Sequence, residues 1–301
     1  MRYPAILGVT RPPFLVLAPV CVLVGLAVFI GEGGRVDWIA AAIVLIGALS
    51  AHVSVNTLNE YEDFRSGLDL RTQRTPFSGG SGTLVAQPAL VEQARAVGLV
   101  SLGLTAICGS ILLLRVGWGL LPIGALGLAI VYFYTSEINH HRWLCLIAPG
   151  LGFGPLMVVG TYYSVSGTWS WSAALASLTP FFLVSNLLLL NQFPDVEADR
   201  SVGRDNLPIA LGLARSLSIY GAFAALAYLS LGLGVALDLL PPGALAAFAT
   251  LPLAVLIYRG VRRVVARGGS LAPDMVPSMA LNVILTLLTP TLLAVGALPG
   301  F

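Results

Sequence analysis

Long apolar runs recur along the whole chain, and they constrain its fold more than any other feature. A run of about 20 apolar residues is long enough to cross the hydrocarbon core of a bilayer as an α-helix. Inside a membrane only helices and closed barrels satisfy the backbone, and these runs are too long and too continuously apolar for barrel strands. The sequence therefore predicts an all-α, polytopic membrane bundle of nine transmembrane helices. The nine runs lie near residues 14–31, 36–56, 96–114, 117–135, 144–164, 172–190, 214–237, 243–261 and 275–297.

The composition excludes an ordinary soluble domain. Apolar residues make up 57% of the 301 residues and charged residues only 10%, whereas roughly a quarter of the residues in a soluble domain are charged. We therefore expect one integral-membrane domain spanning residues 1–301, with the lipid bilayer as its surroundings and no nucleic-acid partner. The sequence carries no signal of the oligomeric state.

All 16 basic residues are arginines, and their distribution predicts how the bundle is oriented. With nine helices, the connections alternate between the two sides of the membrane. Fourteen arginines fall on the side of the N-terminus, and only Arg35 and Arg115 fall on the other. Because basic residues gather on the cytoplasmic side of membrane proteins, we expect a cytoplasmic N-terminus in the cell inner membrane.

Two connections are much longer than the others, at residues 57–95 and 191–213. Structureless connections longer than about 12–15 residues are usually functional or disordered. Both follow an even-numbered helix, so both are expected on the cytoplasmic side. They also resemble each other, since "NTLNEYEDFRSGLD" begins at Asn56 and "NQFPDVEADRSVGRD" begins at Asn191. This similarity suggests two related four-helix halves with a ninth helix added.

The polar residues of the second motif are spaced like one face of a helix. Asn191, Asp195 and Asp199 are four residues apart, which places them one turn apart on a continuous helix. Pro194 fits a first turn or a kink at this point. The motif is therefore expected to present an amide and two carboxylates as one ridge.

The first motif has the same arrangement with one extension. Asn56, Asn59 and Asp63 share a helix face in the same way. Asp69 lies beyond Gly67, so the helix must end or bend before Asp69 joins the others. We expect the ridges of the two motifs to face each other.

The aspartates of the two motifs would then form a cluster that needs cations. Two carboxylates about 4 Å apart repel by roughly 4 kcal/mol at an effective dielectric near 20. Hard oxygen ligands select Mg²⁺ or Ca²⁺, and Mg²⁺ is usually shared between carboxylates and a substrate phosphate. Arginine binds phosphate in a bidentate manner. The candidate metal ligands are Asp63, Asp69, Asp195 and Asp199, and the arginines beside them are Arg71, Arg74 and Arg204.

Other interpretations of these loops stay open. Acids balanced by arginines also form ordinary solvated faces, but two matching ridges on the same membrane side favour the metal site. The glycine-rich stretch "SGGSGTL" at residues 78–84 fits a phosphate-binding nest, a hinge or a plain turn. Tyr134, near the end of the fourth apolar run, fits either an interfacial aromatic belt or a wall beside a cationic intermediate. Glu60 and Glu62 either orient ligands or face water.

The two motifs resemble those of the UbiA superfamily of intramembrane prenyltransferases. That family has nine transmembrane helices and two aspartate-rich motifs, after helices two and six. Its first motif, N-D-x-x-D with a further Asp, corresponds to "NEYED" at residues 59–63 and Asp69. Its second motif, D-x-x-x-D, corresponds to "DVEAD" at residues 195–199. Glu60 stands where the family usually has Asp, and Arg204 stands where Lys is often found.

Within the family the chain looks most like the branch that prenylates 1,4-dihydroxy-2-naphthoate in menaquinone synthesis. The wide spacing from Asp63 to Asp69 fits that branch. So do "TRPPFLVLAPVCVLVGLAV" at residues 10–28 and "PFSGGSGTLV" at residues 76–85. The "LGE"-like stretch that many relatives carry is not evident before the fifth run. The acceptor therefore stays open between this naphthoate and 4-hydroxybenzoate or another quinone or tetrapyrrole precursor.

The resemblance implies a polyprenyl diphosphate and an aromatic acceptor as substrates, with Mg²⁺ held by the four aspartates. It also implies that Asn59, Asn191, Tyr134 and the three arginines lie at the diphosphate. A transporter or channel is the rival from another class, since ionisable residues at membrane sites also mark ion pathways. The acids, however, are expected at helix ends rather than at mid-bilayer, which favours the enzyme.

Overall fold

The computed structural model describes residues 5–268 and 271–300. Every regular element within these ranges is a helix, so the all-α prediction is confirmed. The elements in chain order are η1 (Ala5–Thr10), η2 (Pro12–Phe14), α1 (Leu17–Gly31), α2 (Trp38–Arg65), α3 (Thr83–Ala86), η3 (Pro88–Leu90), α4 (Val91–Val116), η4 (Trp118–Leu120), α5 (Leu121–Phe133), η5 (Ile138–His140), α6 (Arg142–Leu151), η6 (Gly152–Val159), α7 (Gly160–Ser166), α8 (Trp171–Asn191), α9 (Val196–Ser201), α10 (Leu207–Leu211), α11 (Leu213–Ala236), η7 (Pro242–Thr250), α12 (Leu251–Arg267) and α13 (Leu271–Gly296).

The number of membrane spans differs from the expected nine. Seven helices of the described residues are long and apolar enough to cross a bilayer. The pair Ala5–Phe14 and Leu17–Gly31, bent by 42°, would make an eighth. The apolar helix Trp118–Phe133 is shorter than the others. The chain is thus an integral membrane protein, but a count of nine spans is not confirmed, because two of the predicted runs form a bent or a short helix.

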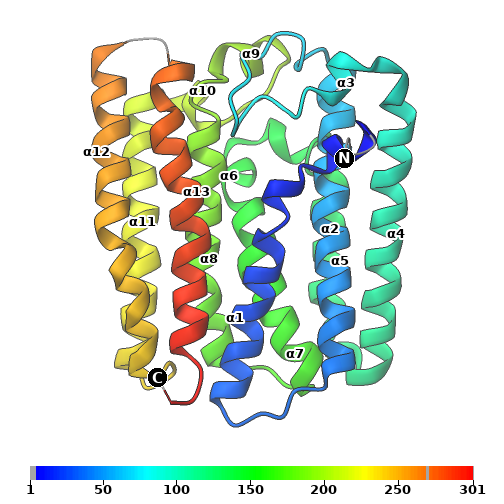
Figure 1. Ribbon diagram of the computed structural model, residues 1–301, viewed down its shortest axis with the longest axis vertical. Helices are drawn as coiled ribbons and strands as arrows, with labels where there is room; N and C mark the ends of the chain where they lie inside the picture. The colour runs from blue at the N-terminus through cyan, green and yellow to red at the C-terminus, as the bar shows by residue number, and fades with distance from the viewer. Residues whose placement is uncertain (1–4, 269–270, 301) are drawn as a thin grey trace.

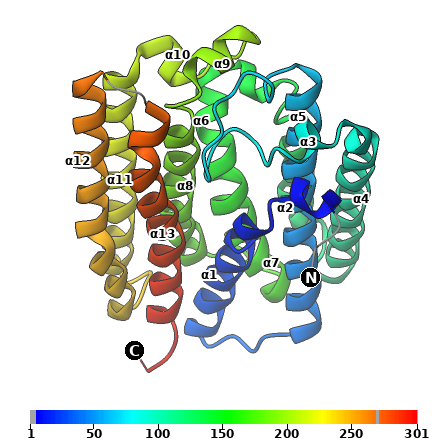
Figure 2. The same ribbon diagram turned by 45° about the horizontal axis from the view of Figure 1, so that its top comes forward.

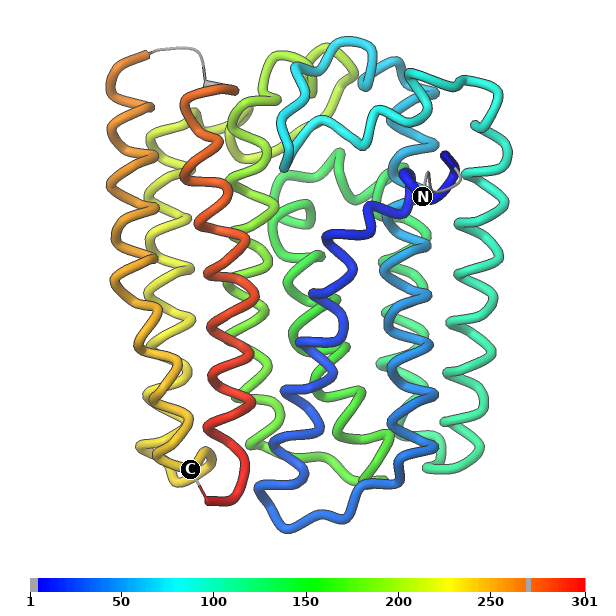
Figure 3. Tube along the Cα trace, in the orientation of Figure 1, coloured from blue at the N-terminus to red at the C-terminus, as the bar shows by residue number. Residues whose placement is uncertain are grey.

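The long helices run side by side along the longest axis of the molecule (Figure 1). The two acidic loops, together with α3, α9 and α10, lie at the same end of the bundle, and the C-terminus lies at the opposite end (Figure 3). Tilting this end toward the viewer shows both loops above the space enclosed by the helices (Figure 2). The bundle therefore brings the two motifs together over its interior.

Local sequence signals set the ends of the helix that carries the first motif. Asp37 accepts hydrogen bonds from the backbone N–H groups of Ile39 (2.9 Å) and Ala40 (3.2 Å), and so caps the start of α2. At its other end α2 stops at Arg65, and Gly67 follows with a φ of +76°. Glycine adopts this left-handed conformation without strain, so the chain can turn back toward Asp69.

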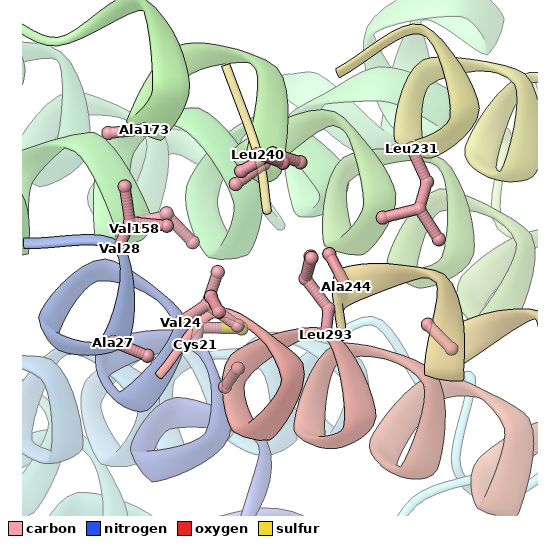
Figure 4. Packing of buried hydrophobic residues seen from close by; sticks show 14 of the residues in the cluster. Cys21, Val24, Ala27, Val28, Val158, Ala173, Leu231, Leu240, Ala244 and Leu293 are labelled. Atoms are coloured by element: carbon pink, nitrogen blue, oxygen red, sulfur yellow. The ribbon is translucent and has the colours of Figure 1, made fainter. Parts of the chain in front are cut away.

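Small residues allow the helices of the core to approach closely. Gly154 lies where an added Cβ would be 2.6 Å from the carbonyl oxygen of Ser177 on α8, so η6 and α8 are in close contact. A buried apolar cluster fills the space beyond this contact and includes Cys21 and Val28 of α1, Val158 of η6 and Leu293 of α13 (Figure 4). This cluster therefore packs α1 against α13.

Candidate active site

Arg204 connects the two acidic motifs. Its guanidinium donates a hydrogen bond to Asp199 at 3.0 Å and forms an ion pair with Asp63, at the end of α2. Asn206 donates to the second carboxylate oxygen of Asp199 at 2.8 Å. Burial works against the charge of Arg204, but the two carboxylates outweigh it and raise its pKa. Asp63 of the first motif and Asp199 of the second are therefore joined through the guanidinium of Arg204.

The polar face expected for the first motif is formed by α2. Asn59 donates to Asp63 at 3.1 Å and also to the hydroxyl of Thr135 at 3.3 Å. Asn56 donates instead to the backbone carbonyl of Thr10, at 2.9 Å. Asn59 and Asp63 thus belong to the site, whereas the amide of Asn56 anchors the N-terminal segment.

The second motif does not form the continuous helical ridge that its spacing predicted. Helix α8 ends at Asn191, and the chain makes a turn before α9 begins after Asp195. Pro194 lies in this turn, in keeping with the break that its sequence position suggested. Asn191, Asp195 and Asp199 therefore come from three different local structures.

Two aspartates of the site have buried oxygens without a hydrogen-bond partner in residues 5–268 and 271–300, namely Oδ2 of Asp69 and Oδ1 of Asp195. Burial raises the pKa of Asp69 to about 7, and the neighbouring charges of Asp63 and Glu60 add to this shift. Burial also raises the pKa of Asp195 to about 7, with a further contribution from the Asp199 carboxylate. Both carboxyl groups therefore hold a proton more tightly than an ordinary aspartate.

The other two predicted arginines lie differently from Arg204. Arg71 is exposed and donates to Ser201, with the hydroxyl at 3.0 Å and the carbonyl at 3.3 Å, so it links the first loop to the second. Arg74 packs against the glycine-rich loop, because its guanidinium occupies the space beside Gly82. Neither forms an ion pair with an aspartate among the residues that the structure describes.

A cavity of about 500 Å³ lies inside the bundle, and Asn59 and Asn191 of the two motifs line it. Its walls are mostly apolar and come from α1, α2, α4, α5, α6, η6, α8 and α13. The predicted residues Asn59, Tyr134 and Asn191 line it, and Arg11 contributes a charge. The site thus joins a charged region at one end of the bundle to an apolar chamber inside it, as an amphiphilic substrate requires.

Sequence reasoning missed Arg11 and Asn206 as parts of the candidate site, and it included Ser81 only within the glycine-rich stretch at residues 78–84. Arg11 was interpreted only as a basic residue that sets membrane orientation, yet its guanidinium lies 3.4 Å from the side-chain oxygen of Asn59. The signal that could have found it is its position in "TRPP", where a charge directly before an apolar helix needs a partner. Ser81 had an available signal in the glycine-rich stretch, but Asn206 had none.

The donor atoms suit a hard divalent cation. Asp69 Oδ2, Asp195 Oδ1 and Asn191 Oδ1 are buried oxygens unpartnered within the described ranges, and Mg²⁺ prefers such oxygens. No three His, Cys, Asp or Glu side chains of those ranges lie close enough together to form a complete site. Since Mg²⁺ usually keeps waters and binds one or two carboxylates plus substrate phosphates, the residues fit a metal that arrives with a phosphate.

Comparisons with known proteins agree with this geometry. The 1,4-dihydroxy-2-naphthoate octaprenyltransferase of Bacillus subtilis is 27% identical to the chain over 256 residues, which cover 83% of the chain and 80% of the relative. The 2-carboxy-1,4-naphthoquinone phytyltransferase of Synechocystis is 26% identical over 265 residues, with coverages of 85% and 81%.

A solved structure shows the same fold at low sequence identity. It is that of a UbiA homologue from Archaeoglobus fulgidus bound to DMAPP and Mg²⁺. The two chains align with a TM-score of 0.62 at 17% identity, over 97% of this chain and 100% of the other. The model of the UbiA prenyltransferase family matches residues 18–295, which is nearly the whole chain. The chain therefore belongs to the UbiA prenyltransferase family and is a prenyltransferase.

Proposed function

We propose that this enzyme transfers a polyprenyl group from its diphosphate to 1,4-dihydroxy-2-naphthoate, with Mg²⁺ as the cofactor, in menaquinone synthesis. The observation that supports the proposal is that charged side chains and an apolar cavity adjoin each other in one site. Asn59 lines a mostly apolar cavity of about 500 Å³ and donates a hydrogen bond to Asp63, which pairs with Arg204. A diphosphate matches this charged group, and an isoprenoid chain matches the apolar chamber.

The metal ligands are assigned to the carboxylates of both motifs. Asp69 and Asp195 offer unpartnered oxygens, and Asp63 and Asp199 become available when Arg204 turns toward the diphosphate. Bound Mg²⁺ supplies Lewis-acid stabilisation of the charge that the diphosphate gains as it leaves. This assignment gives each motif one carboxylate that is free and one that is neutralised by arginine.

The remaining polar residues bind and orient the diphosphate. Arg204 donates bidentate hydrogen bonds to phosphate oxygens, and Arg71 and Arg74 add positive charge from the first loop. Asn59, Asn191 and Tyr134 line the cavity at this level and fix the position of the reacting end. Stabilising the developing charge of the leaving group lowers the barrier, and each 1.36 kcal/mol is about tenfold in rate.

The apolar chamber protects the reactive intermediate. Breaking the bond between the allylic carbon and the diphosphate oxygen leaves a carbocation, which water would quench. An apolar lining keeps water out, so the electron-rich ring can form the new carbon–carbon bond and then lose a proton. The prenyl chain lies along apolar helix faces throughout, and the product leaves into the bilayer.

The names of the relatives support the choice of acceptor. One acts on 1,4-dihydroxy-2-naphthoate and the other on 2-carboxy-1,4-naphthoquinone, which are both bicyclic carboxylated rings. We further propose that the motif end of the bundle faces the cytoplasm in the inner membrane, because fourteen of the sixteen arginines fall on that side of the sequence-based topology.

Product formation by the purified protein in detergent tests the proposal. The assay supplies Mg²⁺, farnesyl or geranylgeranyl diphosphate, and a panel of acceptors that includes 1,4-dihydroxy-2-naphthoate and 4-hydroxybenzoate, with and without EDTA. A prenylated naphthoate that disappears with EDTA is the expected result. Transfer to 4-hydroxybenzoate alone would overturn the acceptor, and undiminished transfer in EDTA would overturn the role of Mg²⁺.

A further inference from the structure

Glu60 is the one residue of the first motif that departs from the family pattern, and its contacts differ from those of the aspartates. Its side chain is fully buried. One carboxylate oxygen accepts hydrogen bonds from Nε of Arg11 (2.7 Å) and from the backbone N–H of Ser81 (2.6 Å), and it forms an ion pair with Nη2 of Arg11 at 2.6 Å. The other oxygen accepts one from the hydroxyl of Ser81 at 2.7 Å. Both carboxylate oxygens therefore accept hydrogen bonds from protein donors.

These donors belong to two separate segments, the N-terminal segment and the glycine-rich loop. Arg11 lies between η1 and η2, in a left-handed conformation with a φ of +51° that is uncommon for a residue other than glycine. Ser81 lies in the glycine-rich loop between α2 and α3. Both segments border the cavity, since Phe14 of the N-terminal segment and Phe77 of the loop line it. One carboxylate on α2 thus fastens two walls of the cavity.

The glycine-rich loop in turn contacts an aspartate of the site. A Cβ added to Gly80 would be 2.8 Å from Oδ1 of Asp69. Gly80 has a φ of +73°, so its backbone approaches the carboxylate at a position where a side chain would collide. Ser81, the neighbour of Gly80, is held by Glu60. Glu60 thus holds the residue next to the one that packs against Asp69.

We propose that Glu60 is a positioning residue that fastens the N-terminal segment and the glycine-rich loop together over the cavity, and so holds Asp69 in place for the diphosphate site. The last step rests on the function proposed above. Both oxygens of Glu60 accept hydrogen bonds from Arg11 or Ser81, whereas Asp69 and Asp195 each have a buried oxygen without a partner in the described residues. The longer arm of Glu, compared with Asp, lets the carboxylate reach both segments.

Limited proteolysis tests the fastening without substrate or metal. The chain contains no lysine, and Arg71 and Arg74 are the only trypsin sites between Gly67 and Gln87. Cleavage there requires the loop to open. In the full-length protein in detergent, we expect Glu60→Ala to speed cleavage at Arg71 and Arg74 about tenfold relative to cleavage at Arg267, because local opening becomes easier.

The matched variants separate fastening from other roles. Arg11→Asn removes the guanidinium and keeps a residue that tolerates the left-handed conformation, so it is expected to speed cleavage about as much as Glu60→Ala. The double variant is expected to match the single ones, because the two residues act through one contact. Glu62→Ala, two residues away on the same helix, is the control and is expected to leave cleavage unchanged. Ser81→Ala is a milder variant, with an expected increase of about threefold, should Glu60→Ala fail to fold.

A kinetic measurement tests the link to Asp69. In Glu60→Ala we expect the Mg²⁺ concentration for half-maximal activity and the KM for prenyl diphosphate to rise severalfold, with the KM for the acceptor unchanged. Unchanged cleavage rates in both Glu60→Ala and Arg11→Asn would overturn the fastening. A double variant whose increase in cleavage equals the sum of the two single effects on the opening free energy would also overturn it. Loss of Mg²⁺ binding with the loop still protected would instead make Glu60 a ligand. If no prenyl transfer occurs at all, the proteolysis result still decides the fastening by itself.

Discussion

Arg204 forms an ion pair with Asp63, although 141 residues separate them in the chain. The same guanidinium donates to Asp199 at 3.0 Å, so one cation is shared between the two motifs. The side chains of Arg204, Asp63 and Asp199 are only 15%, 10% and 4% exposed. Arg204 therefore offsets the repulsion between two largely buried carboxylates.

Replacing Arg204 by Gln is expected to lower the free energy of unfolding by about 3–5 kcal/mol, because removing one partner of a buried ion pair leaves the other charges uncompensated. Mg²⁺ is expected to recover part of this loss, since a divalent cation can neutralise the same carboxylates. Thermal unfolding in detergent, with EDTA or with Mg²⁺, measures both effects.

Arg200→Gln is the matched control for this change. Arg200 pairs with Glu197 at 2.8 Å, but the two side chains are 53% and 84% exposed. Exposed pairs contribute about 0–1 kcal/mol, so this variant should unfold close to the wild-type temperature. Similar losses in the two variants would contradict the special position of Arg204 between the motifs.

The affinity for Mg²⁺ is expected to depend on pH, because protons must leave Asp69 and Asp195 before a cation binds them. Both pKa values are raised to about 7 in the folded protein. Between pH 6 and pH 8 the affinity should therefore rise about tenfold for each carboxylate that the metal engages. Titration calorimetry in two buffers with different ionisation enthalpies measures the affinity and the protons released.

As pH rises, the stability of the metal-free protein should fall, whereas the affinity for Mg²⁺ should rise. An unfolded Asp has a pKa near 3.9, whereas Asp69 and Asp195 have folded values of about 7. The folded state binds more protons than the unfolded state between these values, so the free energy of unfolding falls as pH rises from about 4 to about 7. Stabilisation by Mg²⁺ should grow over the same range. A pH-independent affinity would exclude these two aspartates as ligands.

The parts of the fold that sequence could predict are those set by composition over long windows. Each apolar run forms a helix, and both acidic loops lie at one end of the bundle. The assignment of every run to a full span is not confirmed. The run at 117–135 forms the helix Trp118–Phe133, which is shorter than the candidate spans. The first run is preceded by the helical segment Ala5–Phe14, which meets α1 at a 42° bend. These are local geometric details that average hydrophobicity does not report.

The site was predictable residue by residue only where spacing along one helix decided the outcome. Asn59 and Asp63 are four residues apart on α2 and are hydrogen-bonded. The contact of Asp63 with Arg204 depends on how α2 packs against the loop between α9 and α10. No local sequence pattern predicts it. Arg11 was missed for the same reason, since its partner Glu60 is 49 residues away.

Replacing Asp195 by Asn should separate catalysis from stability. Asp195 forms no ion pair in the described part of the chain, and its Oδ1 atom is buried and unpartnered. The amide should therefore leave the unfolding temperature unchanged or raise it, while kcat falls by at least about 10²-fold. Asp63→Asn should also lose activity, but with lower stability, because Arg204 then loses one partner. Prenyl transfer assays and thermal unfolding test the pair.

Asp274→Asn provides the baseline for these two variants. Asp274 is an exposed carboxylate in the first turn of α13. Its replacement removes the same charge from the protein and should leave turnover unchanged. Wild-type turnover in folded Asp195→Asn would exclude the metal role of that carboxylate.

The apolar chamber should set which prenyl chains the enzyme accepts. Gly109 on α4 lines the cavity, and an added Cβ there would meet no atom within 4 Å. Gly109→Leu therefore places new apolar volume in the chamber, at a position where its Cβ meets no atom of the described residues within 4 Å. We expect kcat/KM for geranylgeranyl diphosphate to fall at least about tenfold relative to dimethylallyl diphosphate, since even one methylene in an apolar pocket is worth about 1–3 kcal/mol.

Gly103 makes this test specific, because it lies on the same helix and also has no atom within 4 Å of an added Cβ. Gly103 is exposed and is not among the residues that line the cavity. Gly103→Leu removes a helical glycine in the same way, so any gain in helix stability, about 0.5–1 kcal/mol, is common to both variants. A shift in chain-length preference in Gly109→Leu alone would locate the prenyl chain in this chamber. Equal preferences in both variants would place the chain elsewhere, for example along the outer helix faces in the lipid.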